Sequence, residues 1–127
     1  LGAAEGLSFE ALNDSSGKVL RQECRYVLSG DTSIARLWTL SAYDKSGKLT
    51  LVTDNKKSAI FSGSLLRFPD GSFTINLSHS PQSGNWLPLN ESNEFRLVMR
   101  LYDTPITSNS GLIIPTMPSI DLVECKS

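Results

Sequence analysis

Hydrophobic and polar residues alternate with a period of two along several short stretches of this chain, a pattern typical of half-buried β-strands. The first such stretch covers 7–11 and runs into a turn-forming sequence at 13–18. A returning arm over 19–28 is expected to complete a first hairpin, with Cys24 among its inward-facing residues. The amino-terminal part of the chain therefore predicts two strands and no helix.

The middle of the chain predicts a second hairpin and one less regular segment. The run 37–43 is rich in β-favouring residues and stops at a turn-forming sequence over 44–48. Residues 49–52 are expected to return as the second arm. The alternation then weakens over 55–62, where either one short helical turn or an irregular crossing is expected.

Two further strands and a long final strand are expected in the second half. Stretches 65–68 and 73–78 flank the sequence Pro-Asp-Gly-Ser, which predicts a third hairpin because proline presets one turn angle and glycine permits a positive one. The stretch 95–102 places odd-numbered apolar residues on one face and puts Arg96 and Arg100 on the other. The apolar face of this strand is expected to face the core.

The tail is rich in proline, which argues against a central strand, but Ile120 and Leu122, with Glu124, can form a short edge strand that brings Cys125 back to the body. Many short strands, turn clusters between them and no crossover helices predict an all-β fold. We expect one domain over residues 1–127, an antiparallel β-sandwich or jelly roll with at most one short helix.

Charge and hydropathy narrow the classes of partner. Twelve Lys and Arg against thirteen Asp and Glu leave a net charge of −1, and no basic cluster offers a surface for phosphates, so no nucleic-acid partner is expected. The apolar runs fall far short of the roughly 20 residues that span a bilayer. Because the sequence begins at Leu1, we expect that a leader or membrane anchor preceded it in the full-length protein.

The chain has two cysteines, Cys24 and Cys125, and neither has the spacing of a metal ligand, so no metal or cofactor is expected. A disulfide between them is expected, closing a loop of about 100 residues and placing the protein in an oxidising compartment. The alternative is a pair of independent buried thiols, since free cysteine is common in protein cores.

Four sequence blocks, in this order and spacing, resemble a bacterial family named domain of unknown function 1214. The resemblance extends from about 7 to 125, and the blocks are Ala35-Arg36-Leu37-Trp38-Thr39-Leu40-Ser41-Ala42-Tyr43-Asp44, Asp70-Gly71-Ser72, Asn85-Trp86-Leu87-Pro88 and Leu97-Val98-Met99-Arg100-Leu101-Tyr102. The chain looks like the short form of the family, in which a leader or anchor precedes one exported domain. The resemblance implies a periplasmic or cell-envelope location, and it brings no reaction, cofactor or catalytic residue.

Catalytic motifs are scarce. No Gly-x-Ser-x-Gly elbow occurs, and His79, the one histidine, is expected to be an ordinary residue at the end of a strand rather than a base. No spacing selects two acids for glycosidase chemistry. Asp14, Asp44 and Asp70 fall in turns, where carboxylates commonly accept hydrogen bonds from backbone amides.

Aromatic, arginine and amide side chains form the remaining candidate site. Such residues could line a pocket for a sugar or a carboxylated small molecule. The alternative is a scaffold role, because tryptophans in a small sandwich mostly pack in the core and an asparagine can hold a loop. The candidates are Arg36, Trp38, Tyr43, Asn85, Trp86, Arg100 and Tyr102.

The leading hypothesis from sequence is an exported, non-catalytic module that binds a small molecule, a sugar or carboxylate, or another envelope protein. The competing hypothesis is a hydrolase or lyase that acts on a carbohydrate or small organic acid, using carboxylates and Arg100 near Trp86. A pocket that brings two acids, or an acid and His79, together would favour the enzyme. Packed tryptophans and paired arginines would favour the module.

Overall fold

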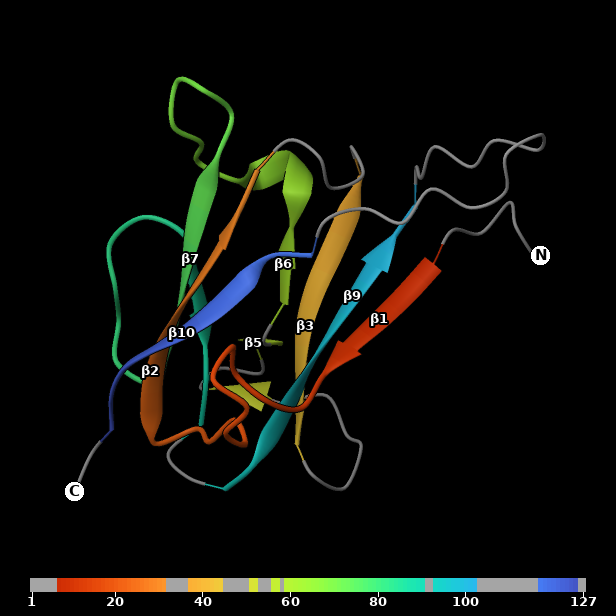
Figure 1. Ribbon diagram of the computed structural model, residues 1–127. Helices are drawn as coiled ribbons and strands as arrows, with labels where there is room; N and C mark the ends of the chain where they lie inside the picture. Colours follow the sequence, from red (N-terminus) through yellow and green to blue (C-terminus); the bar gives the residue numbers. More distant parts are fainter. Residues whose placement is uncertain are drawn as a thin grey trace.

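Two four-stranded β-sheets form the main part of the computed structural model (Figure 1). The structure describes residues 7–31, 37–44, 51–52, 56–57, 59–90, 93–102 and 117–125. The first sheet has, in order, β1 (Leu7–Ala11), β9 (Phe95–Leu101), β3 (Trp38–Asp44) and β6 (Ala59–Phe61). The second has β10 (Ser119–Cys125), β2 (Cys24–Gly30), β7 (Phe73–Ser78) and β8 (Trp86–Pro88). A short pair, β4 (Leu51–Val52) with β5 (Lys56–Lys57), and a 3₁₀ turn, η3 (Ser62–Ser64), complete the described elements. The prediction of an all-β sandwich is confirmed.

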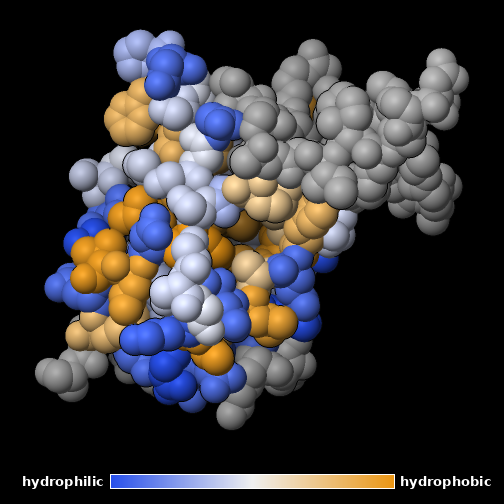
Figure 2. Space-filling view, viewed as in Figure 1, coloured by the Kyte–Doolittle hydropathy of each residue, from blue (hydrophilic) through white to orange (hydrophobic). Residues whose placement is uncertain are grey.

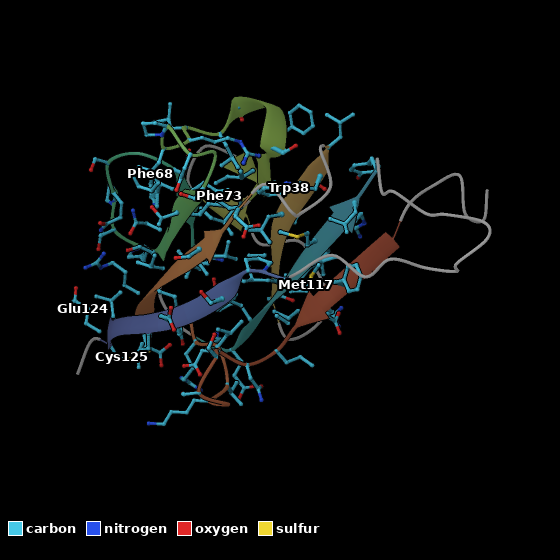
Figure 3. All side chains as sticks on the ribbon, turned by 45° about the horizontal axis from the view of Figure 1, so that its top comes forward. Trp38, Phe68, Phe73, Met117, Glu124 and Cys125 are labelled. Atoms are coloured by element: carbon cyan, nitrogen blue, oxygen red, sulfur yellow. A yellow bond between two sulfur atoms is a disulfide. The ribbon has the colours of Figure 1, made fainter. Side chains whose placement is uncertain are left out.

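The core lies between the two sheets, because alternate residues of each strand point toward the other sheet. Trp38 of β3 and Phe73 of β7 meet there, with ring centroids 5.4 Å apart (Figure 3). Along β9 the alternation follows the prediction, since the odd-numbered residues join the core while Arg96 and Arg100 do not. This packing of both inner faces into one cluster removes the largest side chains from water, which is the main source of stability in such folds.

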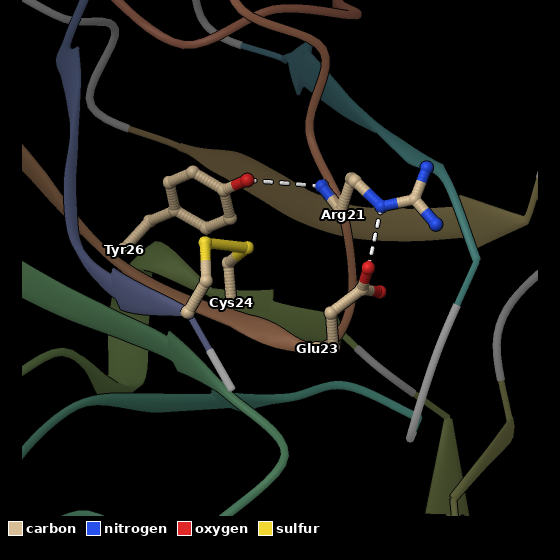
Figure 4. Close-up of a disulfide and its surroundings, with 5 residues drawn as sticks. Arg21, Glu23, Cys24 and Tyr26 are labelled. Atoms are coloured by element: carbon tan, nitrogen blue, oxygen red, sulfur yellow. Dashed lines mark hydrogen bonds and ion pairs between the residues drawn. A yellow bond between two sulfur atoms is a disulfide. The ribbon is translucent and has the colours of Figure 1, made fainter. Parts of the chain in front are cut away.

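Cys24 and Cys125 form a disulfide, as predicted, so the alternative of two free thiols is wrong (Figure 4). They lie opposite each other where β10 pairs with the start of β2. A β-bulge between Leu122 and Glu124 shifts the register by one residue. Without this shift, Cys125 would point to the face opposite Cys24, because neighbouring residues on a strand point to opposite faces.

The predicted edge strand at the carboxyl end exists as β10, but its side chains are more exposed than expected. Ile120 is buried, whereas Leu122 and Glu124 are exposed. The reason is the position of β10 at the edge of its sheet, with one strand neighbour, combined with the bulge. Within the part of the chain that the structure describes, no helix is long and apolar enough to cross a membrane.

The first predicted hairpin is wrong in its pairing. The turn at 13–18 is present, and the Asp14 carboxylate accepts hydrogen bonds from the amides of Ser16 and Lys18. However, β1 pairs with β9 in one sheet and β2 lies in the other, so a single bridge, Asn13 to Val19, joins the two arms. The chain crosses between the sheets after this turn, which lets β1 and β2 each contribute an apolar face to the same core.

The second predicted hairpin is also wrong. Among the described residues, β4 pairs with β5, while the neighbours of β3 are β9 and β6. Over 55–62, where a short helical turn or an irregular crossing was expected, the described residues form β5 and β6, and η3 begins at Ser62. The turn expected at 44–48 lies mostly outside the described residues. Local alternation predicted β3 correctly because it reports burial of one face, and it carries no information on which strand pairs with it.

The third predicted hairpin is half correct. Its turn is closed by hydrogen bonds from the Phe68 amide to the Ser72 carbonyl and from the Gly71 amide to the Phe68 carbonyl, both 2.8 Å, and Gly71 has φ of 91°. The arm 65–68 is not a strand. Instead β7 pairs with β2 and, in parallel, with β8, so the second sheet is mixed rather than purely antiparallel.

Candidate functional site

The candidate residues predicted from sequence do not converge on one site. Trp38 lies in the core, Asn85 and Trp86 lie at the β8 edge of the second sheet, and Tyr43, Arg100 and Tyr102 lie on the outer face of the first sheet. Arg36 lies outside the described residues. A single pocket built from Trp86 and Arg100 is therefore excluded, because these residues belong to outward faces of different sheets.

Trp38 has a structural role. Its side chain has no exposed surface and packs on Phe73, while its amide donates a hydrogen bond to Ser62 Oγ at 2.9 Å. Its indole N–H has no hydrogen-bond partner among the described residues. The residue therefore fixes the sandwich core to η3 and cannot contact a ligand from solvent.

Asn85 acts as a clamp on the irregular arm that the sequence had predicted to be a strand. Its Nδ2 donates to the carbonyls of Leu66, at 2.8 Å, and Thr74, at 2.9 Å, and its Oδ1 accepts from the Leu66 amide at 2.9 Å. A side-chain amide can pair with a backbone in this way because it carries the same donor and acceptor. The clamp replaces the ladder that a strand at 65–68 would have formed.

Trp86 is half-buried on β8, and its Nε1 donates to the Ser78 carbonyl at 2.9 Å. It lies beside Asn76 on the neighbouring strand, whose Oδ1 accepts a hydrogen bond from Arg25. The indole N–H is thus used to hold the edge strand β8 against β7. Together with the Asn85 clamp, this favours the scaffold interpretation for both residues.

The outer face of the first sheet gathers polar chemistry around Arg100. The Arg100 guanidinium donates a hydrogen bond to the Tyr43 hydroxyl at 3.2 Å, and its Cζ lies 5.8 Å from the centre of the Tyr43 ring. The backbones of these residues are offset along the strands, because Arg100 is opposite Thr39 and Tyr43 is opposite Arg96. Their side chains therefore reach toward each other over the row that lies between them.

The residues beneath this contact form a floor that is unusually buried for an outward-facing surface. Ser41 and Val98 face each other across β3 and β9 in the intervening row, and each is 7% exposed. Tyr43 and Arg100 in the rows on either side reach over this row, and long amphipathic side chains can shield apolar surface while their polar ends stay in water. A polar group placed on such a floor is screened less by water than on a bare strand face.

A second arginine lies near the same ring. Arg96 Cζ is 5.9 Å from the Tyr43 ring centre, so both arginines lie within cation–π distance of one ring. The two arginines differ in their partners: Arg96 is 2.9 Å from the Glu10 carboxylate of β1, whereas Arg100 forms no ion pair with any residue that the structure describes. We call Tyr43, Arg96 and Arg100 the arginine–tyrosine cluster.

Hydroxyl groups border the cluster on the Arg100 side. Tyr102 follows β9 directly, and its hydroxyl lies 3.4 Å from Thr39 Oγ1. Thr39 is the residue opposite Arg100 on β3, and on β6 it faces Phe61, which is 46% exposed. One guanidinium, two phenols, a threonine hydroxyl and an exposed aromatic ring therefore share this part of the sheet.

Among the residues that the structure describes, groups needed for hydrolysis do not assemble around the cluster. His79 is exposed at the end of β7, and its Nδ1 lies 3.0 Å from the Leu89 carbonyl. The pKa of Asp14 and that of Asp70 are both lowered, chiefly by hydrogen bonds from the hydroxyls of Ser16 and Ser72, so both carboxylates serve turns as predicted. Over the described ranges, no three His, Cys, Asp or Glu side chains lie close enough to hold a metal ion.

Sequence reasoning missed three members of this surface: Arg96, Glu10 and Thr39. A sequence signal existed for Arg96, because the alternation along one strand places it on the same face as Arg100. Glu10 and Thr39 carried none, since their positions depend on β1 and β3 both pairing with β9.

Comparisons with known proteins identify a family without a described activity. The family model described as "Protein of unknown function (DUF1214)" matches residues 5–106. No protein with a curated description matches the sequence. Two solved structures share the fold: the VPA0106 protein from Vibrio parahaemolyticus, with a TM-score of 0.76 and 20% identity, and an uncharacterized protein from Burkholderia cenocepacia, with a TM-score of 0.64 and 19% identity. They align with 98% and 97% of this chain, which in turn spans 32% and 31% of their lengths.

Proposed function

The chain belongs to the DUF1214 family of proteins of unknown function, and we propose that it is an exported, non-catalytic module that binds a small carboxylate, such as a sugar acid, at the arginine–tyrosine cluster. The observation that carries this proposal is the set of partners of the Arg100 guanidinium. It contacts the hydroxyl and ring of Tyr43 above the buried residues Ser41 and Val98, and it has no carboxylate partner among the described residues.

Charge complementarity supports an anionic ligand. Arg96 and Arg100 bring two positive charges to the cluster and Glu10, the ion-pair partner of Arg96, brings one negative charge, so these three residues carry a net charge of +1. Because Glu10 is used by Arg96, the uncompensated charge lies at Arg100. A ligand carboxylate would pair with Arg100 as the Glu10 carboxylate pairs with Arg96.

The geometry of the donors supports a carboxylate in particular. A guanidinium offers parallel N–H groups that match the two oxygens of a carboxylate. The hydroxyls of Tyr102 and Thr39 lie next to Arg100 and can donate to or accept from sugar hydroxyls. The exposed ring of Phe61 offers an apolar surface for the flat face of a sugar ring. A sugar acid therefore fits the set better than a neutral sugar.

The proposed location is the periplasm or cell envelope. The support for it is the Cys24–Cys125 bond, since structural disulfides persist in oxidising compartments and are rare in the cytosol. A binding role suits this setting, because the disulfide is stable outside the reducing cytosol and there helps to keep the fold, and with it the binding surface, intact.

Calorimetric titration at low salt tests the proposal, with galacturonate as the carboxylate probe and galactose as its neutral counterpart. Galacturonate should bind and galactose should bind much more weakly. Arg100→Gln should weaken galacturonate binding by roughly 10- to 100-fold, because a hydrogen bond to a charged group contributes about 1.5–3 kcal/mol. Tyr43→Phe should give a smaller loss, since the ring remains and the hydroxyl that positions Arg100 is removed.

The matched control is Arg25→Gln, which removes one arginine from the second sheet, where Arg25 forms an ion pair with Glu124. Binding should survive in it within about threefold. Equal affinity for galactose, or an Arg100→Gln variant that binds as well as the unmodified protein, would contradict the proposal. Turnover of the probe would replace the binding module by the hydrolase or lyase considered from sequence.

A further inference from the structure

β1 and β10 are edge strands of the two sheets (Figure 1). Residues of both strands line an apolar cleft. Its volume is about 200 Å³. In Figure 2, apolar side chains gather in this region between β10 and β1. Residues from both sheets line it, among them Phe9, Ala11, Leu28, Leu40, Met99 and Met117.

The interior of the cleft is apolar. Leu28 and Leu40 at its base belong to the buried core, and each is 1% exposed. Glu10 is the one charged residue among the described lining residues, and its carboxylate is already paired with Arg96 at 2.9 Å. The described lining of the cleft therefore offers neither a free charge nor a row of hydrogen-bond donors, so a charged group placed against it would lose hydration without compensation.

We propose that this cleft is a binding site for a small uncharged apolar molecule, a ring of the size of benzene or a short alkyl chain. The size supports this class, since an apolar protein cavity of about 150 Å³ is enough to bind benzene or xenon. An apolar occupant is favoured because it removes the apolar lining of the cleft from contact with water. The site is separate from the arginine–tyrosine cluster, which lies on the outer face of the first sheet.

Two features suit this site to accepting a ligand. Met99 lines the cleft from β9 and Met117 from the residues that lead into β10 (Figure 3), and methionine side chains adapt to irregular volumes better than branched ones. At the other end of β10, Cys125 fixes the strand to β2 through the disulfide. Met117 therefore gives the cleft an adjustable side chain next to the start of β10, while the far end of the strand, beyond the described lining, is tied covalently to β2.

Methyl NMR offers a direct test, because the chain has two methionines and both line the cleft. Protein labelled with ¹³C at the methionine methyl groups gives two signals to follow. The probes are benzene, 1-hexanol and hexanoate. Both methyl signals should shift saturably with benzene and with hexanol, whereas hexanoate should bind at least tenfold more weakly because its charge is not compensated in the cleft.

Two alanine substitutions on the same sheet form a matched pair. Ala11→Phe fills the cleft from β1, and Ala59→Phe adds the same ring at an exposed position on β6. Benzene affinity should fall at least tenfold in the first variant and stay unchanged in the second. If Ala11→Phe loses its dispersed spectrum, Ala11→Leu replaces it as the milder filling variant.

Three results would overturn the proposal. Methyl signals that do not respond to any probe would show that the cleft is closed or filled by the protein itself. An equal loss of affinity in both alanine variants would place the probe elsewhere. Hexanoate affinity equal to that of hexanol would rule out the uncharged ligand class.

Discussion

The disulfide between Cys24 and Cys125 is expected to supply a large share of the stability of this fold. The bonded residues are 101 positions apart in sequence. For a loop of about 100 residues, the chain-entropy model gives about 4.7 kcal/mol at 25 °C, because the closed loop restricts the unfolded chain. A domain usually unfolds with about 5–15 kcal/mol, so losing the bond should remove from roughly a third to nearly all of the total.

The perturbation is the double variant Cys24→Ala with Cys125→Ala. Cys24 is buried and Cys125 is exposed, so the substitutions remove little packing besides the bond. Unfolding entropy near 60 °C is about 2.1 cal/mol/K per residue, and over 127 residues a loss of about 4.7 kcal/mol lowers the Tm by about 18 °C. The folded structure should persist at low temperature, because the bond acts mainly on the unfolded state.

Urea unfolding followed by tryptophan fluorescence measures the loss, with and without a reducing agent. The unmodified protein should lose a similar free energy on reduction, and the double variant should not respond to the reducing agent at all. A thiol assay confirms that the bond was broken. A loss below about 1 kcal/mol with the bond shown to be broken would refute the loop-entropy reasoning.

Three further predictions, made with four substitutions, test the structural roles assigned above, all by urea unfolding. Asn85→Ala should lower the free energy of unfolding by about 2–3 kcal/mol, because three hydrogen bonds between the Asn85 side chain and the backbone are lost. An unchanged urea midpoint would contradict the clamp. Trp38→Ala should cost about 3–5 kcal/mol, clearly more than Trp86→Ala, because Trp38 is fully buried and Trp86 is half-buried; equal costs would contradict this. The pKa of Asp14 is lowered mainly by the Ser16 hydroxyl, so Asp14→Asn should be less stable than the unmodified protein at pH 7, above the usual carboxyl pKa of 3.8. This difference in the free energy of unfolding should shrink as pH falls through the lower pKa that Asp14 has in the folded state. A constant difference from pH 7 to pH 2 would contradict the prediction.

The strands themselves were largely predictable because each buries one face. In β9 and β2 the alternation assigned the inward residues correctly, and Cys24 was placed on the core face. Pairing was predicted poorly because adjacent strands in the sequence were assumed to be neighbours in the sheet. Here β1 and β2 lie in different sheets, and a turn between two strands does not distinguish a hairpin from a crossing between layers.

The candidate site failed for the same reason. Alternation placed Arg100 on the face that points away from the core, but no strand was predicted at Trp86, so neither its face nor its sheet was known. The pairing of Arg96 with Glu10 depends on the contact between β1 and β9, which the predicted first hairpin excluded. Residues that share a strand, such as Arg96 and Arg100, were the reliable part of the site, because their relative position needs no knowledge of the sheet order.

The apolar cleft shows a different limit of sequence reasoning. A hydrophobic pattern states which side chains face the interior, and Phe9, Ala11 and Met99 were rightly placed there. It does not state whether those side chains fill the space between two edge strands, because that depends on the volumes that meet across the sandwich. In β1 the smallest inward side chain, Ala11, lies opposite Leu97 at the edge of the sheet. The alternation of hydrophobic and polar residues does not reveal the space that this small side chain leaves unfilled. A binding site of this kind is visible only once the two edge strands are placed beside each other in space.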